Sequence, residues 1–277
     1  MKAPAFDFVR PRSLGEAVRL LASGGGEARV IAGGQSLLAL MNLRLATPAL
    51  LIDIARLSEL ALISEGEDAV ILGAGVTHAM IEDARVPDPS RGLMPHAAAS
   101  LAYRAIRTRG TIGGSLALAD PAAEWPAVLA ALDAEASVCG PSGRRALKCV
   151  GFATGIYETR LAEDEIVESI HIPKLSADAR WGYVKLARKS GEFANALAVA
   201  VTDRARGYCR VVLGAANGAP LVLAEASRVL ADADRAADMW RGVVEADLDR
   251  AAECHFDEFQ RNLHTVAATR ALRQVTA

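Results

Sequence analysis

The sequence has few cysteines, and they lie far apart. The four are Cys139, Cys149, Cys209 and Cys254. No two of them form a C-x-x-C pair, and none is clustered with histidine, so their spacing predicts neither a disulfide framework nor a zinc or iron–sulfur site. We therefore expect that this chain binds no metal.

The sequence also lacks a large excess of charge of one sign, and it lacks long apolar runs. Lys and Arg number 31 against 33 Asp and Glu, which leaves a formal net charge of -2, and no long basic run argues for nucleic acid as a partner. No apolar stretch approaches the length of a membrane span, and the opening MKAPAFDFVRPR has no apolar signal region. We expect a cytoplasmic chain with no membrane span and no export signal of its own.

Catalytic constellations are also absent from the sequence. No Ser-His-Asp set, candidate nucleophile or group of metal ligands stands out, so we expect no catalytic residue in this chain. With 277 residues, of which 52% are hydrophobic and 23% charged, the chain can nevertheless bury a sizeable core and form more than one domain.

What the sequence does contain is two similar glycine-bearing stretches, residues 29–54 and residues 109–133. Each starts with a short β-type run, breaks on paired glycines and meets a serine before an apolar segment. The matching pieces are Val30-Ile31, Gly33-Gly34 and Ser36 in the first stretch and Thr111-Ile112, Gly113-Gly114 and Ser115 in the second. Glycine lets the backbone approach a ligand, and hydroxyl and N–H groups suit phosphate oxygens. We interpret the two stretches as loops that hold one phosphate-bearing cofactor.

Ordinary turns are the alternative for either loop taken alone, because glycine pairs punctuate many globular chains. Neither loop matches G-x-G-x-x-G, and neither ends in the Lys-Ser/Thr of a P-loop. These mismatches argue against a Rossmann or NTPase site.

The residues around the loops carry a resemblance to a known family. AGGQSLLALMNLRLATPALLIDI and TIGGSLALADPAAEWPAVLAALDA resemble the two FAD-binding signatures of the flavoprotein (medium) subunit of molybdenum hydroxylases, the family of carbon monoxide dehydrogenase and xanthine dehydrogenase. FDFVRPRSLGEAV, YVKLARKSGEFA and FQRNLHTVAATRAL extend the likeness over nearly the whole chain. The resemblance implies an α+β chain with a vanillyl-alcohol-oxidase-type (PCMH-type) FAD-binding fold. Two α/β subdomains, residues 1–57 and 58–175, would precede a C-terminal α/β domain, residues 176–277, with a small antiparallel sheet and helices.

Carried onto matching positions, the resemblance implies FAD-binding residues in both loops and at five further places. They are Ala32, Gly33, Gly34, Gln35, Ser36, Leu37, Thr111, Ile112, Gly113, Gly114, Ser115, Asp120, Glu124, Leu161, Lys185 and Phe193. Glu124, where most relatives have Asp, would accept hydrogen bonds from ribityl hydroxyls. Lys185 would donate to a flavin carbonyl, and Phe193 would screen the flavin ring.

Simpler interpretations of these residues stay open. Asp120 could be the N-cap of a helix over residues 121–132, and core packing is the favoured explanation for the apolar run over residues 37–45. Lys185 could lie on an exposed strand, and Phe193 could pack beneath the C-terminal domain. In that last domain, helical patterns cover residues 222–231, 236–254 and 259–275.

The resemblance further implies an electron-transfer subunit. It would take electrons from a [2Fe-2S] small subunit and pass them to an external acceptor, while a molybdopterin large subunit hydroxylates the substrate, in a dimer of heterotrimers. One alternative is a self-contained flavin-dependent oxidase or dehydrogenase of the same fold, with His78, His96 or His171 as acid–base residue. The other is a non-catalytic nucleotide-binding module.

Overall fold

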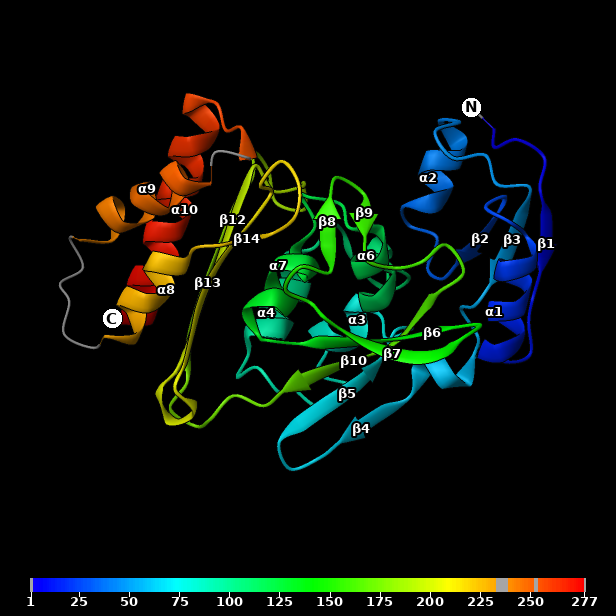
Figure 1. The fold of residues 1–277 in the computed structure, drawn as a ribbon, viewed down its shortest axis with the longest axis horizontal. Helices are drawn as coiled ribbons and strands as arrows, with labels where there is room; N and C mark the ends of the chain where they lie inside the picture. The colour runs from blue at the N-terminus through cyan, green and yellow to red at the C-terminus, as the bar shows by residue number, and fades with distance from the viewer. Residues whose placement is uncertain (1, 233–238, 252–253, 277) are drawn as a thin grey trace.

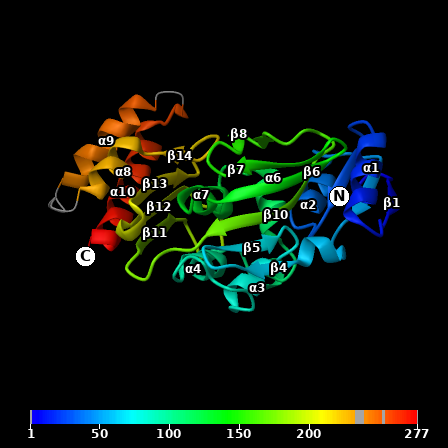
Figure 2. The ribbon, with the colours of Figure 1, turned by 60° about the horizontal axis from the view of Figure 1, so that its bottom comes forward.

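The computed structural model describes residues 2–232, 239–251 and 254–276. Three main sheets follow one another along an elongated molecule, with the N-terminal part at one end and the C-terminal helices at the other (Figure 1). The second view shows the same row, with the two chain ends far apart (Figure 2).

The first sheet is parallel and has the order β1-β3-β2. Its strands are β1 (Asp7–Val9), β2 (Ala28–Ile31) and β3 (Leu50–Asp53), and helix α1 (Leu14–Ser23) connects the first two. Ser13 caps α1 as its sequence position predicts, because its hydroxyl accepts a hydrogen bond from the Glu16 N–H at 3.2 Å. The helix buries Ala17 and Leu21 on one face, which attaches it to the sheet.

The second sheet is antiparallel, with the order β4-β5-β10-β6-β7. Its strands are β4 (Ile63–Glu65), β5 (Ala69–Gly73), β6 (Glu135–Gly140), β7 (Gly143–Lys148) and β10 (Ile166–Pro173), preceded by the 3-10 helix η1 (Ser58–Ala61). All the helices of this part lie between β5 and β6 in the sequence: α3 (His78–Glu82), α4 (Leu93–Ser100), α5 (Arg104–Arg107), α6 (Ile112–Leu118) and α7 (Glu124–Ala131). A small pair, β8 (Ala153–Gly155) and β9 (Glu158–Thr159), stands apart from the sheet.

The third sheet is buried on both faces. It consists of β11 (Arg180–Leu186), β12 (Ala196–Asp203), β13 (Tyr208–Gly214) and β14 (Leu221–Val222), in that order. Helices α8 (Ala224–Ala231), α9 (Trp240–Arg250) and α10 (Glu258–Thr276) gather on one side of it (Figure 1).

The sequence of β12 explains this double burial. Leu197, Val199 and Val201 point into the core shared with α7. Ala196, Ala198 and Ala200 alternate with them and belong to the cluster formed with α8, α9 and α10. Because side chains alternate between the faces of a strand, the large residues fill one side and the small ones let helices approach on the other.

The apolar run over residues 37–45 is not core, so that interpretation was wrong. It forms the short helix α2 (Leu37–Asn42), in which only Met41 is buried. Leu38, Leu43 and Leu45 are 43%, 57% and 73% exposed. A helix of six residues makes fewer than two turns, so few of its positions can be buried, and Leu37 and Leu40 are only half-buried.

Two local expectations in the second glycine stretch were also wrong. Thr111 and Ile112 are not a strand: Thr111 caps α6, since its hydroxyl accepts from the Gly114 N–H at 3.1 Å, and Ile112 is the first helical residue. Asp120 does not cap α7, because its carboxylate accepts from the Ala122 N–H at 2.9 Å and closes a separate turn. The helix therefore begins at Glu124 rather than at Pro121.

The remaining expectations concern the C-terminal helices and the membrane. Of the helix expected over residues 236–254, the structure describes α9; residues 236–238 and 252–253 lie outside the described part.

Among described residues, no helix has the length and apolar character needed to cross a membrane. The proposed domain boundaries at 57 and 175 stay a prediction.

Helix α10 lies close against β11 at Gly182. A Cβ there would lie 2.0 Å from the Ala271 carbonyl oxygen, so Gly182→Ala should force backbone apart and lower the free energy of unfolding by about 1–3 kcal/mol. Gly218→Ala is the control, because a Cβ at Gly218 meets nothing within 4 Å. Urea denaturation of both variants tests this; equal midpoints would mean that α10 does not pack this tightly on β11.

Candidate functional site

The first glycine loop, residues 32–37, joins β2 to α2 and offers unused hydrogen-bond donors. Its backbone N–H groups donate to no atom of the described residues. Gly34 has φ +72°, which turns the chain out of the strand direction, and the Gln35 amide donates to the Gly33 carbonyl at 3.2 Å. Gln35 and Ser36 are exposed. A run of accessible, unpaired N–H groups is an arrangement that binds anions.

The second glycine loop differs, because its N–H groups are already used. Ile112 donates to the Val76 carbonyl and Gly113 to the Ala74 carbonyl, both at 3.0 Å. The Gly114 and Ser115 N–H groups both donate to Thr111, at its hydroxyl and carbonyl oxygens. This loop can therefore offer hydroxyl groups and a surface to a ligand but not a set of free N–H groups.

The two loops lie against each other, as the sequence interpretation requires. A Cβ on Gly33 would lie 1.9 Å from the Arg109 carbonyl oxygen, so only glycine allows the first loop to touch the start of the second. A Cβ on Gly113 would lie 2.3 Å from the Ala74 Cβ, which makes the same demand where α6 meets the end of β5. Both glycines serve close backbone approach.

His78 supports the second loop from beneath. Its N–H donates to the Gly110 carbonyl at 3.0 Å, and its Nδ1 accepts from the Trp125 indole N–H at 3.0 Å. Burial, with a smaller contribution from the charge of Arg107, lowers the pKa of His78 to about 4, so the ring is neutral. Its role is structural, and Trp125, which the sequence interpretation missed, is its partner.

Glu124 and Lys185, both predicted site residues, form a buried ion pair. The Lys185 Nζ lies 2.6 Å from Glu124 Oε1 and also donates to the Ser100 carbonyl at 3.0 Å. Lys185 is thus not on an exposed strand, and that interpretation was wrong. Burial raises the pKa of Glu124, although the charge of Lys185 opposes the shift.

Asp120 meets a residue that the sequence interpretation missed. The Tyr157 hydroxyl donates to the Asp120 carboxylate at 3.2 Å, and the Tyr157 N–H donates to the Ala119 carbonyl at 3.2 Å. Tyr157 has φ +57° and occupies the turn between β8 and β9. These two hydrogen bonds hold the turn over the end of α6. No local sequence signal predicts this contact.

Within the described part of the chain, Leu161 and Phe193 form no hydrogen bond with the other predicted residues. Leu161 is half-buried, and its N–H donates to the Thr159 hydroxyl at 3.2 Å. Phe193 is 67% exposed, so the interpretation that it packs beneath the C-terminal domain was wrong. Its loop turns at Gly191, which has φ +81°.

Neither His96 nor His171 shows the geometry of an acid–base residue. His96 lies against the rings of Trp181 and Tyr183, with centroid distances of 5.4 and 5.2 Å. His171 is exposed on β10. Within the described residues, no three His, Cys, Asp or Glu side chains gather as metal ligands.

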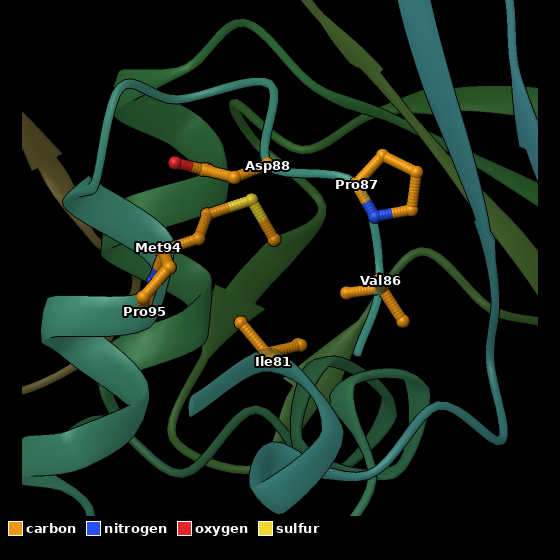
Figure 3. Close-up of a pocket in the computed structure, with 6 residues that line it drawn as sticks. All are labelled: Ile81, Val86, Pro87, Asp88, Met94 and Pro95. Atoms are coloured by element: carbon orange, nitrogen blue, oxygen red, sulfur yellow. The ribbon is translucent and has the colours of Figure 1, made fainter. Parts of the chain in front are cut away.

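A small depression between α3 and α4 is not a ligand site. Figure 3 shows Ile81, Val86, Pro87, Asp88, Met94 and Pro95 around it. It leaves no room for a water-sized sphere. The Asp88 carboxylate is already occupied by the N–H groups of Ser90 and Gly92.

Comparison with known proteins assigns the family. The family described as FAD binding domain in molybdopterin dehydrogenase matches residues 4–175. The chain is 38% identical over 226 residues to caffeine dehydrogenase subunit beta of Pseudomonas sp. (strain CBB1), which covers 80% of this chain and 76% of that protein. It is 37% identical to the carbon monoxide dehydrogenase medium chain of Hydrogenophaga pseudoflava, over 80% of this chain and 78% of the other. The chain belongs to this flavoprotein family.

Solved structures agree with the assignment. Carbon monoxide dehydrogenase from Hydrogenophaga pseudoflava matches with a TM-score of 0.89 at 34% identity, covering 99% of this chain and 98% of that one. Quinoline 2-oxidoreductase from Pseudomonas putida 86 matches with a TM-score of 0.88 at 31% identity, covering 100% and 98%. The family resemblance, the FAD-binding fold and the expectation of an FAD-dependent oxidoreductase subunit are confirmed.

The buried ion pair gives a prediction about stability. Lys185→Met leaves the Glu124 carboxylate buried without its partner, so the free energy of unfolding should fall by about 3 kcal/mol or more. The double variant Glu124→Met/Lys185→Met should recover most of this loss, because two apolar side chains need no charge partner. Chemical denaturation at neutral pH measures both values.

The control is an exposed pair. Arg241→Met removes the partner of Glu245 on α9, where both side chains are solvated, and should change stability by less than about 1 kcal/mol. A double variant at Glu124 and Lys185 that is no more stable than Lys185→Met would show that the two side chains are not coupled.

Proposed function

We propose that this flavoprotein holds FAD between its two glycine loops and serves as the electron-transfer subunit of a molybdenum hydroxylase. The observation that supports this most directly is the first loop, residues 32–37, whose N–H groups donate to no atom of the described residues and which lies beside the second loop. The close approach of Gly33 to the Arg109 carbonyl supports this proposal, because it brings the two loops side by side.

The residues present suit the two ends of this cofactor. At the diphosphate end, the N–H groups of residues 32–37 would donate to phosphate oxygens, and the hydroxyls of Thr111 and Ser115 would add donors from the second loop. Ala32, Leu37, Ile112 and the glycines would shape the surface. Substitutions in the second loop should therefore weaken binding of the charged phosphates less than substitutions in the first loop.

At the ribityl and ring end, Glu124 and Lys185 would act as a pair. Lys185 has three N–H donors, of which two go to Glu124 and Ser100, so one remains for a flavin carbonyl. Lys185 binds one carboxylate oxygen of Glu124, and no described residue donates a hydrogen bond to the other. That second oxygen can accept a hydrogen bond from a ribityl hydroxyl. Asp120, Leu161 and Phe193 would complete this end.

When bound, FAD supplies transfer of electrons singly or in pairs between a one-electron donor and an acceptor. The contribution of the chain is to orient it and to fix the charges around it. Lys185 keeps a positive charge beside the ring and Glu124 balances that charge, so burial of the pair does not leave a net charge inside the protein.

The partners in this proposal are an iron–sulfur small subunit that delivers electrons and a molybdopterin large subunit that oxidises the substrate, in a dimer of heterotrimers. Support comes from relatives that are named as medium chains or subunits of carbon monoxide and nicotine-oxidising enzymes. An external acceptor would take the electrons. The cytoplasmic location stays a prediction.

A self-contained oxidase would need an acid–base residue beside the ring. His78 is buried with its Nδ1 engaged by Trp125, which removes one of the three candidates. The FAD-loaded chain alone should therefore not be reduced by aldehydes or N-heterocycles under anaerobic conditions, while adding the partner subunits should permit reduction. Rapid bleaching of the isolated chain by such a substrate would favour the oxidase.

The first loop gives a direct test of cofactor binding. Gly34 has φ +72°, so Gly34→Ala strains the loop and should reorient its N–H groups, lowering FAD affinity by at least about tenfold. Gly25→Ala is a matched control, since Gly25 also has positive φ, at +53°, in the turn before β2. Flavin absorbance relative to protein absorbance reports the content; full occupancy in Gly34→Ala would remove the loop from the site.

The exposed Phe193 gives a test of acceptor access. If its ring covers the flavin, Phe193→Ala should speed reoxidation of the reduced protein by oxygen or a dye without changing FAD content, since the phosphate-binding loops are elsewhere. Phe259→Ala, which removes a ring that is 69% exposed on α10, is the control. Stopped-flow reoxidation measures the rates, and identical rates for Phe193→Ala and wild type would exclude a screening role.

A further inference from the structure

One charged side chain stands where the two glycine loops meet. Arg109 is exposed, and it is the sole charged residue in residues 32–37 and 109–119. Its carbonyl oxygen lies against Gly33, 1.9 Å from the position that a Cβ on this glycine would take. The Arg109 side chain therefore starts beside the backbone N–H groups of the first loop.

Arg109 differs from the two arginines that precede it, because it has no carboxylate partner. Arg104 forms ion pairs with Glu82 and Asp83, and Arg107 pairs with Glu82. In the part of the chain that the structure describes, the Arg109 guanidinium takes part in no ion pair and no hydrogen bond. Its N–H donors are consequently available to an anion.

The backbone on both sides of Arg109 is fixed. The N–H groups of Arg109 and Gly110 both donate to the Ile106 carbonyl, at 3.0 and 2.8 Å, and the Gly110 carbonyl accepts from the His78 N–H at 3.0 Å. A Cβ on Gly110 would lie 2.7 Å from the His78 Nε2, so the chain is packed tightly on that side. Little backbone ordering is therefore needed before the side chain can bind a ligand beside the loops.

The charges of the predicted site residues leave a diphosphate without a counter-charge. Asp120 and Glu124 are carboxylates, whereas Lys185 is the one cation among them and is already paired with Glu124. His78 adds no charge, because burial lowers its pKa to about 4. The phosphates of FAD are negatively charged, and a guanidinium binds phosphate oxygens through charge-assisted hydrogen bonds. Arg109 is the cation at the loops that can balance them.

We infer that Arg109 binds the diphosphate of FAD, as a cofactor-binding residue outside the predicted set. The N–H groups of residues 32–37 orient the phosphate oxygens, and the Arg109 guanidinium supplies the positive charge that these neutral donors lack. This inference rests on the proposed function, since it requires FAD to lie between the two glycine loops.

Titration of the flavin-free chain with FAD, followed by flavin fluorescence, tests the inference at about 50 mM and about 500 mM salt. At low salt, Arg109→Gln should bind FAD about three- to tenfold more weakly than wild type, because a charge-assisted contact at an exposed position is lost. The difference should shrink at high salt, since ions screen the attraction. Arg109→Lys keeps the charge and should retain most of the affinity at low salt.

Arg204→Gln is the matched control. Arg204 is also exposed, its side chain has no partner among the described residues, and it lies on the 3-10 helix η2 (Arg204–Arg206) between β12 and β13. The substitution changes the net charge by the same amount as Arg109→Gln. Arg204→Gln should nevertheless bind FAD like wild type at both salt concentrations.

Three results would overturn the assignment of Arg109. One is equal FAD affinity of Arg109→Gln and wild type at low salt while Gly34→Ala binds weakly, which leaves the proposed function intact. Another is a loss of affinity that is the same at both salt concentrations, and the third is a loss that Arg109→Lys does not relieve; either would give Arg109 a structural role. A wild-type chain that binds no FAD would overturn the proposed function together with this inference.

Discussion

The contact between Gly33 and the Arg109 carbonyl is the constraint on which the candidate site depends. The first loop belongs to a parallel three-stranded sheet and the second to the helices of an antiparallel one, so nothing in either sheet holds them together directly. Any side chain at Gly33 would keep the backbones apart. Because Gly33 and Arg109, which are 76 residues apart in sequence, lie in contact, groups from both loops could act on one ligand.

The two loops look alike in sequence, but their backbone N–H groups differ in hydrogen bonding. The first has a strand before it and a short exposed helix after it, which leaves its N–H groups unpaired. The second is tied down by Val76, Ala74 and the Thr111 cap. If the N–H groups of the second loop were unpaired, these hydrogen bonds would be absent. The close approach of Gly113 to Ala74 depends on them. Rigidity on one side and free donors on the other are therefore linked properties of the site.

Local signals were sufficient for much of the fold. Ser13 and Thr77 cap helices through their hydroxyls, a role that serine and threonine favour, and the apolar run over residues 196–203 forms the strand β12. Thr111 was misassigned because a threonine followed by isoleucine suits a strand, whereas a threonine is also a favourable N-cap. The exposure of α2 could not be predicted, since its apolar run fits a core face and only the tertiary structure shows that Met41 alone is fully buried.

The pair of Glu124 and Lys185 shows where sequence reasoning reaches its limit. The two residues are 61 apart, and each has a sufficient local explanation, one as a first-turn helix charge and the other as a strand residue. Their pairing follows from α7 packing on β12 and β13, which brings Glu124 at the start of α7 within reach of Lys185 on the neighbouring strand β11. The charge at the ring end of the proposed cofactor site would consequently be set by how the third sheet packs on α7, and a change in that packing, even far from the glycine loops, would alter the electrostatics that a bound cofactor experiences.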